Sequence, residues 1–205
     1  MTATRRNASP PPAVRPGAAR NRLRIIGGDW RSRIVRFPDA AGLRPTPDRV
    51  RETLFNWLGQ DLTGRSCLDL FAGSGALGFE ALSRNAQSVT MVEREARARD
   101  ALAAHAQLLG AGARARIEGG DALQFLRECR AVFDVIFLDP PFGSGLVDRA
   151  WPWLDALLAT DGVVYVESGT TFEVPAGWRA LKRSQAGSVC YQLLARNLTE
   201  APNVQ

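Results

Sequence analysis

Ser66-Cys-Leu-Asp-Leu-Phe-Ala-Gly-Ser-Gly-Ala-Leu-Gly78 is the stretch that decides the fold. Its first five residues, of which Cys67, Leu68 and Leu70 are apolar, are typical of a short strand, and the glycines after them permit a tight turn into a helix. Gly73, Gly75 and Gly78 satisfy the spacing G-x-G-x-x-G, which in a strand–turn–helix context indicates a site for a nucleoside cofactor. The stretch therefore predicts the first βαβ unit of an open α/β sheet.

The chain beyond this stretch alternates β-rich runs with helical ones. We expect strands at 66–70, 88–93, 114–118, 133–138 and 162–167, and helices at 76–84, 96–109, 121–129 and 146–158. Such alternation produces right-handed crossovers and a mainly parallel, doubly wound sheet with helices on both faces. Residues 178–183 and 188–195, which flank a Gln-Ala-Gly segment, predict a terminal antiparallel hairpin at the sheet edge.

A hairpin and a helix are expected to precede the sheet. Two β-rich runs, 23–26 and 30–37, flank a Gly-Gly-Asp segment that would form the hairpin turn. Thr46 is a suitable N-cap and Pro47 a suitable first helical residue, and apolar residues follow at helical spacing as far as Gly59.

The charge of the chain is unevenly distributed. Residues 1–51 contain 12 Arg and three Asp, a balance of +9, whereas residues 52–205 contain 14 basic and 18 acidic side chains, a balance of −4. A basic end on a slightly acidic body is the expected footprint of a phosphate-rich partner. The candidate contacts with such a partner on the hairpin and the helix are Arg24, Arg31, Arg33, Arg36 and Arg49.

Composition limits the other possibilities. With 205 residues, 45% of them hydrophobic, the chain can bury the core of one domain plus an appendage. It contains no run of 18 apolar residues and no signal-peptide pattern, so we expect a soluble, cytoplasmic and monomeric protein that binds no membrane. The expected parts are a disordered basic tail (1–21), a hairpin-and-helix extension (22–60), the sheet domain (61–197) and a C-terminal tail (198–205).

The three cysteines form no CxxC pair, and the chain has no histidine cluster, so we expect neither a disulfide framework nor a metal site. Cys67 and Cys190 lie in apolar strands and are interpreted as core thiols.

Asp139-Pro140-Pro141-Phe142 directly follows the apolar strand that ends at Leu138. The simplest interpretation is a strand terminator, because proline cannot donate to the ladder. In the functional interpretation, which we prefer, the prolines fix the turn so that Asp139 and nearby carbonyls accept hydrogen bonds from an exocyclic amino group. Phe142 would then offer a stacking face for a planar base. This turn and the glycine-rich turn should face one crevice, since both follow carboxyl ends of strands.

Glu93 ends the next strand 20 residues after Gly73, which completes a dinucleotide pattern in which the acid binds ribose hydroxyls. Taken alone, this pattern permits a nicotinamide or flavin enzyme. Asp69 argues against that function, because a dinucleotide pyrophosphate would face an extra negative charge; a carboxylate there suits a cofactor with a positive amino-acid end, such as S-adenosylmethionine. Asp121 opens a helix and is either an acceptor for an adenine amino group or an ordinary N-cap.

The remaining polar and aromatic residues are interpreted as structural. His105 should lie on a helix surface or at the edge of the core, and Trp151 and Trp153 should pack against the sheet. Asp134 and Glu167, at strand ends, receive no role.

Residues 23–195 resemble the bacterial family of 16S ribosomal RNA guanine-N2 methyltransferases. The segments that carry the resemblance are Arg24-Ile-Ile-Gly-Gly28, Leu43-Arg-Pro-Thr-Pro-Asp-Arg-Val-Arg-Glu-Thr-Leu-Phe-Asn-Trp57, Asp69 to Gly78 with Glu80-Ala-Leu-Ser-Arg84, and Asp139-Pro-Pro-Phe142. The resemblance implies a Rossmann-like class I methyltransferase fold and S-adenosylmethionine as the donor, without a metal. It also implies 16S rRNA, in the small ribosomal subunit or an assembly intermediate, as the partner. The candidate cofactor residues are Asp69, Phe71, Gly73, Gly75, Glu93, Asp121 and Ala122, and the guanine amino group would lie against Asp139, Pro140, Pro141 and Phe142.

The expected mechanism is direct transfer of the methyl group, in which positioning and electrostatics lower the barrier and no covalent nucleophile takes part. Three alternatives remain: methylation of adenine N6 in DNA or RNA, a nicotinamide-dependent oxidoreductase, and a noncatalytic RNA-binding module. The residues themselves do not distinguish guanine N2 from adenine N6, and only the resemblance does.

Overall fold

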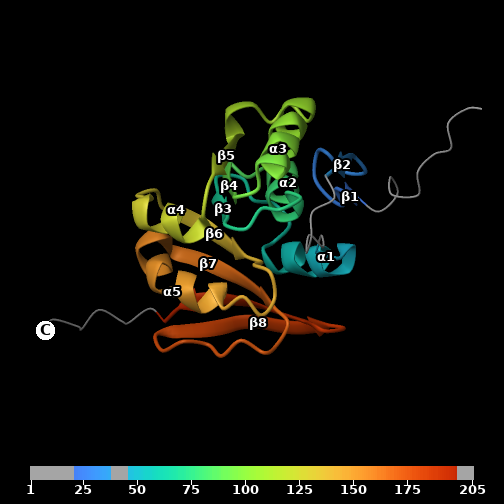
Figure 1. The fold of residues 1–205 in the computed structure, drawn as a ribbon. Helices are drawn as coiled ribbons and strands as arrows, with labels where there is room; N and C mark the ends of the chain where they lie inside the picture. Colours follow the sequence, from blue (N-terminus) through green and yellow to red (C-terminus); the bar gives the residue numbers. More distant parts are fainter. Residues whose placement is uncertain (1–20, 38–45, 198–205) are drawn as a thin grey trace, which may run out of the picture.

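The computed structural model describes residues 21–37 and 46–197, and a seven-stranded sheet lies at its centre (Figure 1). The strand order is β5-β4-β3-β6-β7-β9-β8. β3 to β7 are parallel, whereas β9 is antiparallel to both of its neighbours, which confirms the predicted parallel sheet with a terminal hairpin. The strands are β3 (Ser66–Asp69), β4 (Ser88–Glu93), β5 (Ala115–Gly119), β6 (Phe133–Leu138), β7 (Leu158–Ser168), β8 (Trp178–Ala186) and β9 (Val189–Arg196).

Helices cover both faces of the sheet, as Figure 1 shows. Side chains alternate along the strands, so Cys67 and Phe137 join the apolar cluster that contains residues of α1, α2 and α3, whereas Leu68 and Ile136 join the cluster under α4 and α5. The sheet is therefore doubly wound, as predicted. The helices are α1 (Asp48–Trp57), α2 (Ala76–Ser83), α3 (Ala96–Leu108), the short 3₁₀ helix η2 (Gly112–Arg114), α4 (Ala122–Glu128) and α5 (Leu146–Leu157).

α1 covers part of the sheet on the same face as α2 and α3. Phe55 packs on Phe137 of β6, with ring centroids 6.1 Å apart, and Trp57 packs on Tyr191 of β9 at 5.3 Å. The predicted N-cap role of Thr46 is wrong: the N-cap residue is Pro47, and no side chain caps this helix end. The hydroxyl of Thr46 instead donates to Oδ2 of Asp139, the residue directly after β6. A carboxylate oxygen is a stronger acceptor than a neutral group.

The N-terminal hairpin is present, but its strands are shorter than predicted. Gly27 and Gly28 do more than form a hairpin turn, because they allow the backbone to approach the end of α2. An ideal Cβ at Gly28, where φ is +72°, would lie 1.8 Å from the carbonyl oxygen of Ser83. An ideal Cβ at Gly27 would lie 2.2 Å from Nη2 of Arg84. The two strands are β1 (Arg22–Arg24) and β2 (Ile34–Arg36), which pair antiparallel.

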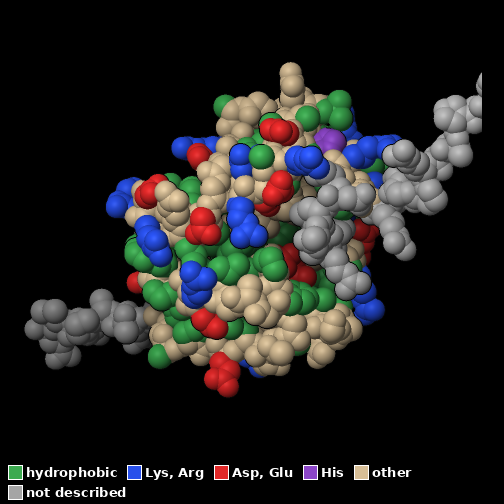
Figure 2. All heavy atoms as spheres, viewed as in Figure 1, with side chains coloured by type: hydrophobic (Ala, Val, Ile, Leu, Met, Phe, Trp, Pro, Cys, Tyr) green, Lys and Arg blue, Asp and Glu red, His purple; other side chains and the backbone are tan. Residues whose placement is uncertain are grey.

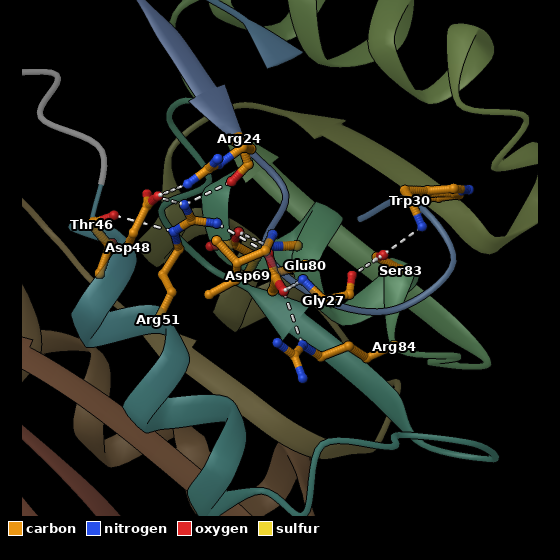
Figure 3. Close-up of polar contacts among 12 residues, drawn as sticks. Arg24, Gly27, Trp30, Thr46, Asp48, Arg51, Asp69, Glu80, Ser83 and Arg84 are labelled. Carbon is orange, nitrogen blue, oxygen red and sulfur yellow. Dashed lines mark hydrogen bonds and ion pairs between the residues drawn. The ribbon is translucent and has the colours of Figure 1, made fainter. Parts of the chain in front are cut away.

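Glu80 of α2 is completely buried and joins the hairpin and α1 to the sheet domain (Figure 3). Its Oε2 accepts from the backbone N–H of Ile26 at 2.9 Å and from Nη1 of Arg51 at 3.1 Å. Its Oε1 accepts from the N–H of Gly27 at 2.8 Å and from Nε of Arg84 at 2.9 Å. Four donors from three segments of the chain thus converge on one carboxylate, and the predicted extension (22–60) shares one core with the sheet domain.

Arg51 of α1 is equally buried and uses all three of its guanidinium nitrogens. Nη1 binds Glu80, and Nη2 donates to the carbonyl oxygen of Arg24 at 2.9 Å and to Oδ1 of Asp48 at 2.6 Å. Nε donates to the carbonyl oxygen of Thr46 at 3.2 Å. Figure 3 shows the guanidinium between these partners, so the start of α1 is held in place by a side chain one turn further along it.

The two tryptophans of α5 differ. Trp151 packs against Phe172 and Trp178, at ring centroid distances of 5.2 and 4.8 Å, which agrees with its predicted structural role. Trp153 is 40% exposed, so its predicted packing against the sheet is wrong. Residues two apart on a helix point to different sides, and only one of the pair can face the core.

Cys67 is buried as predicted, whereas Cys190 is only half-buried, because its position on β9 lies near the exposed turn of the terminal hairpin. His105 lies at the edge of the core, where its ring contacts the backbone of Arg36 and packs edge-on against Phe79. Within residues 21–37 and 46–197, no helix is long and apolar enough to cross a membrane. The predicted tails, 1–21 and 198–205, lie outside the described residues except for Asn21.

We expect the substitution Glu80→Gln to lower the free energy of unfolding by about 3 to 5 kcal/mol, because it leaves the buried guanidinium of Arg84 without its counter-charge and leaves that of Arg51 with only the half-exposed Asp48. The amide nitrogen of Gln would also face N–H donors instead of accepting from them. Urea denaturation of both proteins measures this difference.

The matched control for this substitution is Glu118→Gln, which removes a carboxylate that pairs with the exposed Arg116. A surface pair of this kind contributes less than about 1 kcal/mol. Equal losses in the two variants would show that the convergence of donors on Glu80 does not stabilise the fold.

Candidate functional site

The carboxyl ends of the central strands open into a cavity of about 1100 Å³. The strand order reverses between β3 and β6, and ligands of open α/β sheets bind at such a switch point. Figure 2 shows this face of the molecule, which is hollowed near its middle where hydrophobic and acidic side chains meet. Segments that line the cavity are 69–74 after β3, 92–95 at the end of β4, 120–122 before α4, and 139–142 after β6.

The glycine-rich turn and the end of β4 are joined by Glu93. Oε2 of Glu93 accepts from the N–H of Gly73 at 2.8 Å, and Oε1 accepts from the N–H of Glu95 at 2.7 Å. Each carboxylate oxygen has a second lone pair, so Glu93 can still accept from hydroxyl groups of a ligand in the cavity. The two members of the sequence pattern, Gly73 and Glu93, therefore lie together in three dimensions.

Gly75 is placed differently from the prediction. It does not line the cavity, and an ideal Cβ there would lie 2.5 Å from the ring of Phe79 and 2.6 Å from Leu102. Its φ of +76° forms the left-handed start of α2. Gly75 is thus required for the turn and for helix packing, and a side chain at this position would enter the core instead of the cavity.

Asp69 lines the cavity at the end of β3, although only 2% of its surface is exposed. Its Oδ2 accepts from the N–H of Gly78 at 2.9 Å. Burial raises the pKa of Asp69 to about 7, and the charges of Asp139 and Glu93 also raise it, against the Gly78 hydrogen bond that lowers it. A positive group in the cavity would relieve this unfavourable burial of negative charge.

Asp121 is the N-cap of α4: its Oδ1 accepts from the N–H groups of Leu123 at 2.9 Å and of Gln124 at 3.1 Å. The structural interpretation of Asp121 is therefore confirmed, and its second oxygen remains free of these bonds. Phe71 and Ala122 also line the cavity and pack against the apolar cluster under α4 and α5. They supply an apolar wall for a planar ring next to an acceptor.

Asp139, after β6, meets a residue that comes from the N-terminal extension. Its Oδ2 accepts from the hydroxyl of Thr46 at 3.0 Å. Burial raises the pKa of Asp139 to about 6, and the Thr46 hydrogen bond opposes this rise. Pro140, Pro141 and Phe142 continue the same wall of the cavity.

Phe142 is 49% exposed at the edge of the cavity. An ideal Cβ at Gly169 would lie 3.3 Å from its ring, so the ring rests against the backbone at the end of β7. Ser188 and Val189, from the β8–β9 turn, line the cavity as well. One side of the Phe142 ring is thus supported, which suits a stacking surface.

Glu167 and Thr46 are site residues that sequence reasoning missed. Glu167, at the end of β7, lines the cavity with 3% of its surface exposed. Burial raises the pKa of Glu167 to about 8, and the charge of Asp139 adds to the rise. The available signal was its place at the carboxyl end of a parallel strand, the same edge as Asp139. Thr46 carried no such signal, because its partner is 93 residues away.

The predicted RNA-binding arginines are exposed but do not line the cavity; they are Arg24, Arg31, Arg33, Arg36 and Arg49. Arg94 and Arg97, which the prediction did not include, do line it. In the part of the chain that the structure describes, no group of three or more His, Cys, Asp or Glu side chains could hold a metal ion.

Comparisons with known proteins extend over nearly all of this fold. The family model "Conserved hypothetical protein 95" matches residues 23–195. Ribosomal RNA small subunit methyltransferase D of Escherichia coli K12 is 44% identical over 179 residues, which cover 85% of this chain and 90% of that protein. The protein of the same name from Haemophilus influenzae is 41% identical over 182 residues, which cover 85% and 94%. The chain belongs to this family.

A solved structure of the Escherichia coli protein yhhF agrees with this assignment. It superposes with a TM-score of 0.79 at 40% identity and covers 87% of this chain and 99% of that one. The resemblance to small subunit methyltransferases that the sequence motifs indicated is therefore confirmed, as is the Rossmann-like fold.

In this member of the small subunit methyltransferase D family, we expect Asp69→Asn to raise the free energy of unfolding at alkaline pH. The pKa of Asp69 is about 7 in the folded protein, against 3.8 for an unperturbed Asp. As pH rises, the Asp69 carboxyl group therefore loses its proton in the unfolded chain before it does so in the folded protein. The wild type consequently loses stability between about pH 4 and pH 7. Asn avoids the loss and can still accept from Gly78. The variant should gain up to about 4 kcal/mol over the wild type at pH 8 and little at pH 4, since one pKa unit corresponds to about 1.4 kcal/mol.

Urea denaturation between pH 4 and pH 8 measures this gain, with Asp61→Asn as a control of opposite sign. Hydrogen bonds from the side chains of Thr63 and Asn85 lower the pKa of the exposed Asp61, so its removal should cost stability at neutral pH and less as pH falls. A gain for Asp69→Asn that is the same at every pH would refute the buried-charge explanation.

Proposed function

We propose that this protein transfers the methyl group of S-adenosylmethionine to the exocyclic N2 of a guanine in 16S ribosomal RNA. The observation that carries the proposal is the shared cavity: it joins the Gly73–Glu93 turn, suited to a nucleoside, to the Asp139–Phe142 turn, suited to an amino-bearing base. The names of the relatives, ribosomal RNA small subunit methyltransferase D, support RNA of the small subunit as the substrate.

S-adenosylmethionine, when bound, supplies a methyl group made electrophilic by a positively charged sulfur. The acidic lining of the cavity suits this cofactor. Glu93 would accept from the ribose hydroxyls, Asp121 from the adenine amino group through its free oxygen, and Asp69 would face the positive amino-acid end. Phe71 and Ala122 would enclose the adenine ring.

A nicotinamide dinucleotide suits the same cavity less well. Its pyrophosphate would lie near Asp69, whose burial already disfavours negative charge. The cavity therefore favours the methyltransferase over the oxidoreductase that the glycine spacing alone permitted.

The turn after β6 would hold the target amine. The guanine N2 lone pair is delocalised into the ring, so acceptors that bind the amino hydrogens favour a more nucleophilic nitrogen. Asp139 and the carbonyl groups of the turn can supply such acceptors, and Phe142 can stack on the base. Because N2 lies on the base-pairing edge, the guanine must be unpaired or flipped out of its stack. Positioning and electrostatics then carry the transfer without a covalent nucleophile.

The decisive experiment incubates the protein with labelled S-adenosylmethionine and small ribosomal subunits that lack methylation, and then maps the modified nucleotide by mass spectrometry. Labelled N2-methylguanine in 16S rRNA is the expected product. The acceptors of the turn would serve adenine N6 equally well, so labelled N6-methyladenine would replace the guanine proposal with the adenine one. No transfer to any RNA would overturn both.

In the same assay we expect Asp139→Ala to reduce single-turnover rates by about 100-fold or more, because it removes an acceptor for the amine. Cofactor affinity in a calorimetric titration should stay nearly unchanged, since Asp139 belongs to the base side of the cavity. A variant as fast as the wild type would remove Asp139 from the catalytic residues.

The exposed hairpin arginines are the proposed electrostatic contact with RNA. Replacing Arg31, Arg33 and Arg36 together by Ala should weaken binding to the small subunit and lower the salt slope by up to about two or three units. A control with the same change in net charge replaces exposed arginines on the opposite side of the sheet, namely Arg127, Arg130 and Arg149. A salt-titrated binding assay in which the control weakens binding as much would show that net charge, and not the hairpin, is recognised.

A further inference from the structure

Glu167 is a buried carboxyl group in the wall of the cavity for which the mechanism above has no use. It lies on β7, which pairs in parallel with β6, so Glu167 and Asp139 come to the same edge of the sheet. Both line the cavity, and Glu167 is 3% exposed. Its Oε2 accepts from the hydroxyl of Tyr165, two residues earlier on the same face of the strand, at 2.9 Å.

Thr46 links the two carboxyl groups. Its hydroxyl donates to Oδ2 of Asp139 at 3.0 Å, and the same hydroxyl lowers the pKa of Glu167, which means that it would favour Glu167 as an acceptor if Glu167 were ionised. A hydroxyl group has one proton and two lone pairs, so it can donate to only one of the two carboxyl groups at a time. The Thr46 hydroxyl stays with Asp139 when Asp139 is ionised and Glu167 is protonated, because a neutral Glu167 is a much weaker competitor for its proton than a carboxylate.

The surroundings disfavour two ionised carboxylates at once. Within residues 21–37 and 46–197, the titratable groups whose charges act on the pair are Asp69 at the end of β3 and Tyr165 on β7, and neither is positive. The cationic side chains that line the cavity, Arg94 and Arg97, follow β4 and are not among the groups that shift the pKa of either carboxyl group. Burial, reinforced for Glu167 by the charge of Asp139, raises the pKa of Asp139 to about 6 and that of Glu167 to about 8. Between these values the pair holds a single proton.

We propose that Asp139, Thr46 and Glu167 act as one unit, in which neutral Glu167 is a positioning residue. It keeps the Thr46 hydroxyl turned toward Oδ2 of Asp139, and this leaves Oδ1 of Asp139 free for the target amine. The inference rests on the proposed function. In the reaction, the amine nitrogen forms a bond to the methyl carbon, and the carbon–sulfur bond breaks with its electron pair left on sulfur. One N–H proton passes to Asp139, from which water removes it after the product leaves.

The test is the pH profile of single-turnover methylation by wild type and by Glu167→Gln. The wild type should lose activity below about pH 6, where Asp139 takes up a proton, and above about pH 8, where ionised Glu167 competes for the Thr46 hydroxyl. The Gln side chain stays neutral at every pH, so it never competes as an anion for the Thr46 hydroxyl. Glu167→Gln should therefore lose the alkaline limb, whereas the acid limb, which belongs to Asp139, should remain.

Two further variants separate positioning from packing. Thr46→Val keeps the shape but lacks the hydroxyl, so it should lower the rate by about 10-fold, the value of one hydrogen bond, and should also lack the alkaline limb. Glu173→Gln removes an exposed carboxylate from the segment after β7 and should keep both limbs. An alkaline limb that persists in Glu167→Gln would overturn the proposal, since a merely structural Glu167 would leave the pH profile unchanged.

Infrared difference spectra of the unliganded protein, wild type minus Glu167→Gln, test the pair without any activity. A protonated carboxyl band should be present at pH 7 and absent well above pH 8. If the band is present but no RNA is methylated, the proposed function fails and the proton-sharing pair stands. An ionised Glu167 at pH 7 overturns the pair, whatever the enzyme methylates.

Discussion

The buried ion pairs of Glu80 are the interaction on which the rest of the structure depends. A carboxylate without exposure to water is tolerated only when its lone pairs are satisfied and its charge is balanced. Glu80 meets both conditions with two guanidinium groups and two backbone N–H groups. These donors come from the hairpin loop, from α1 and from α2 itself, so α2 cannot bury its carboxylate unless the N-terminal extension is in place. The extension is consequently part of the domain core.

The hydrogen bonds around Glu80 also continue as far as the turn proposed to hold the target amine. Arg51, which balances Glu80, holds the carbonyl group of Thr46, and the hydroxyl of Thr46 reaches Asp139. The same guanidinium binds the carbonyl oxygen of Arg24 on the hairpin. One side chain therefore connects the hairpin that carries the proposed RNA contacts with the carboxyl group proposed to hold the target amine. A methyltransferase sheet without this extension would have Asp139 but not its hydrogen-bond donor.

The cavity combines two requirements that oppose each other in a folded protein. Burial of Asp69, Asp139 and Glu167 raises the pKa of each, which means that the fold resists their negative charge. A cationic sulfonium cofactor and an amine that develops positive charge both need such charge close by. Ligands of the proposed chemistry would therefore relieve an electrostatic cost that the fold carries.

The sequence by itself determined the elements, the sheet class and two of the turns that line the cavity. Strand and helix periodicity, the glycine turn and the prolines after Leu138 are local, because backbone preferences depend on a few neighbouring residues. Only the tertiary structure decided that Thr46 binds Asp139 instead of capping α1, that Gly75 faces the core, and that Glu167 belongs to the site. The partners of a side chain are set by packing between segments far apart in the chain, and no local pattern encodes which acceptor a hydroxyl will meet.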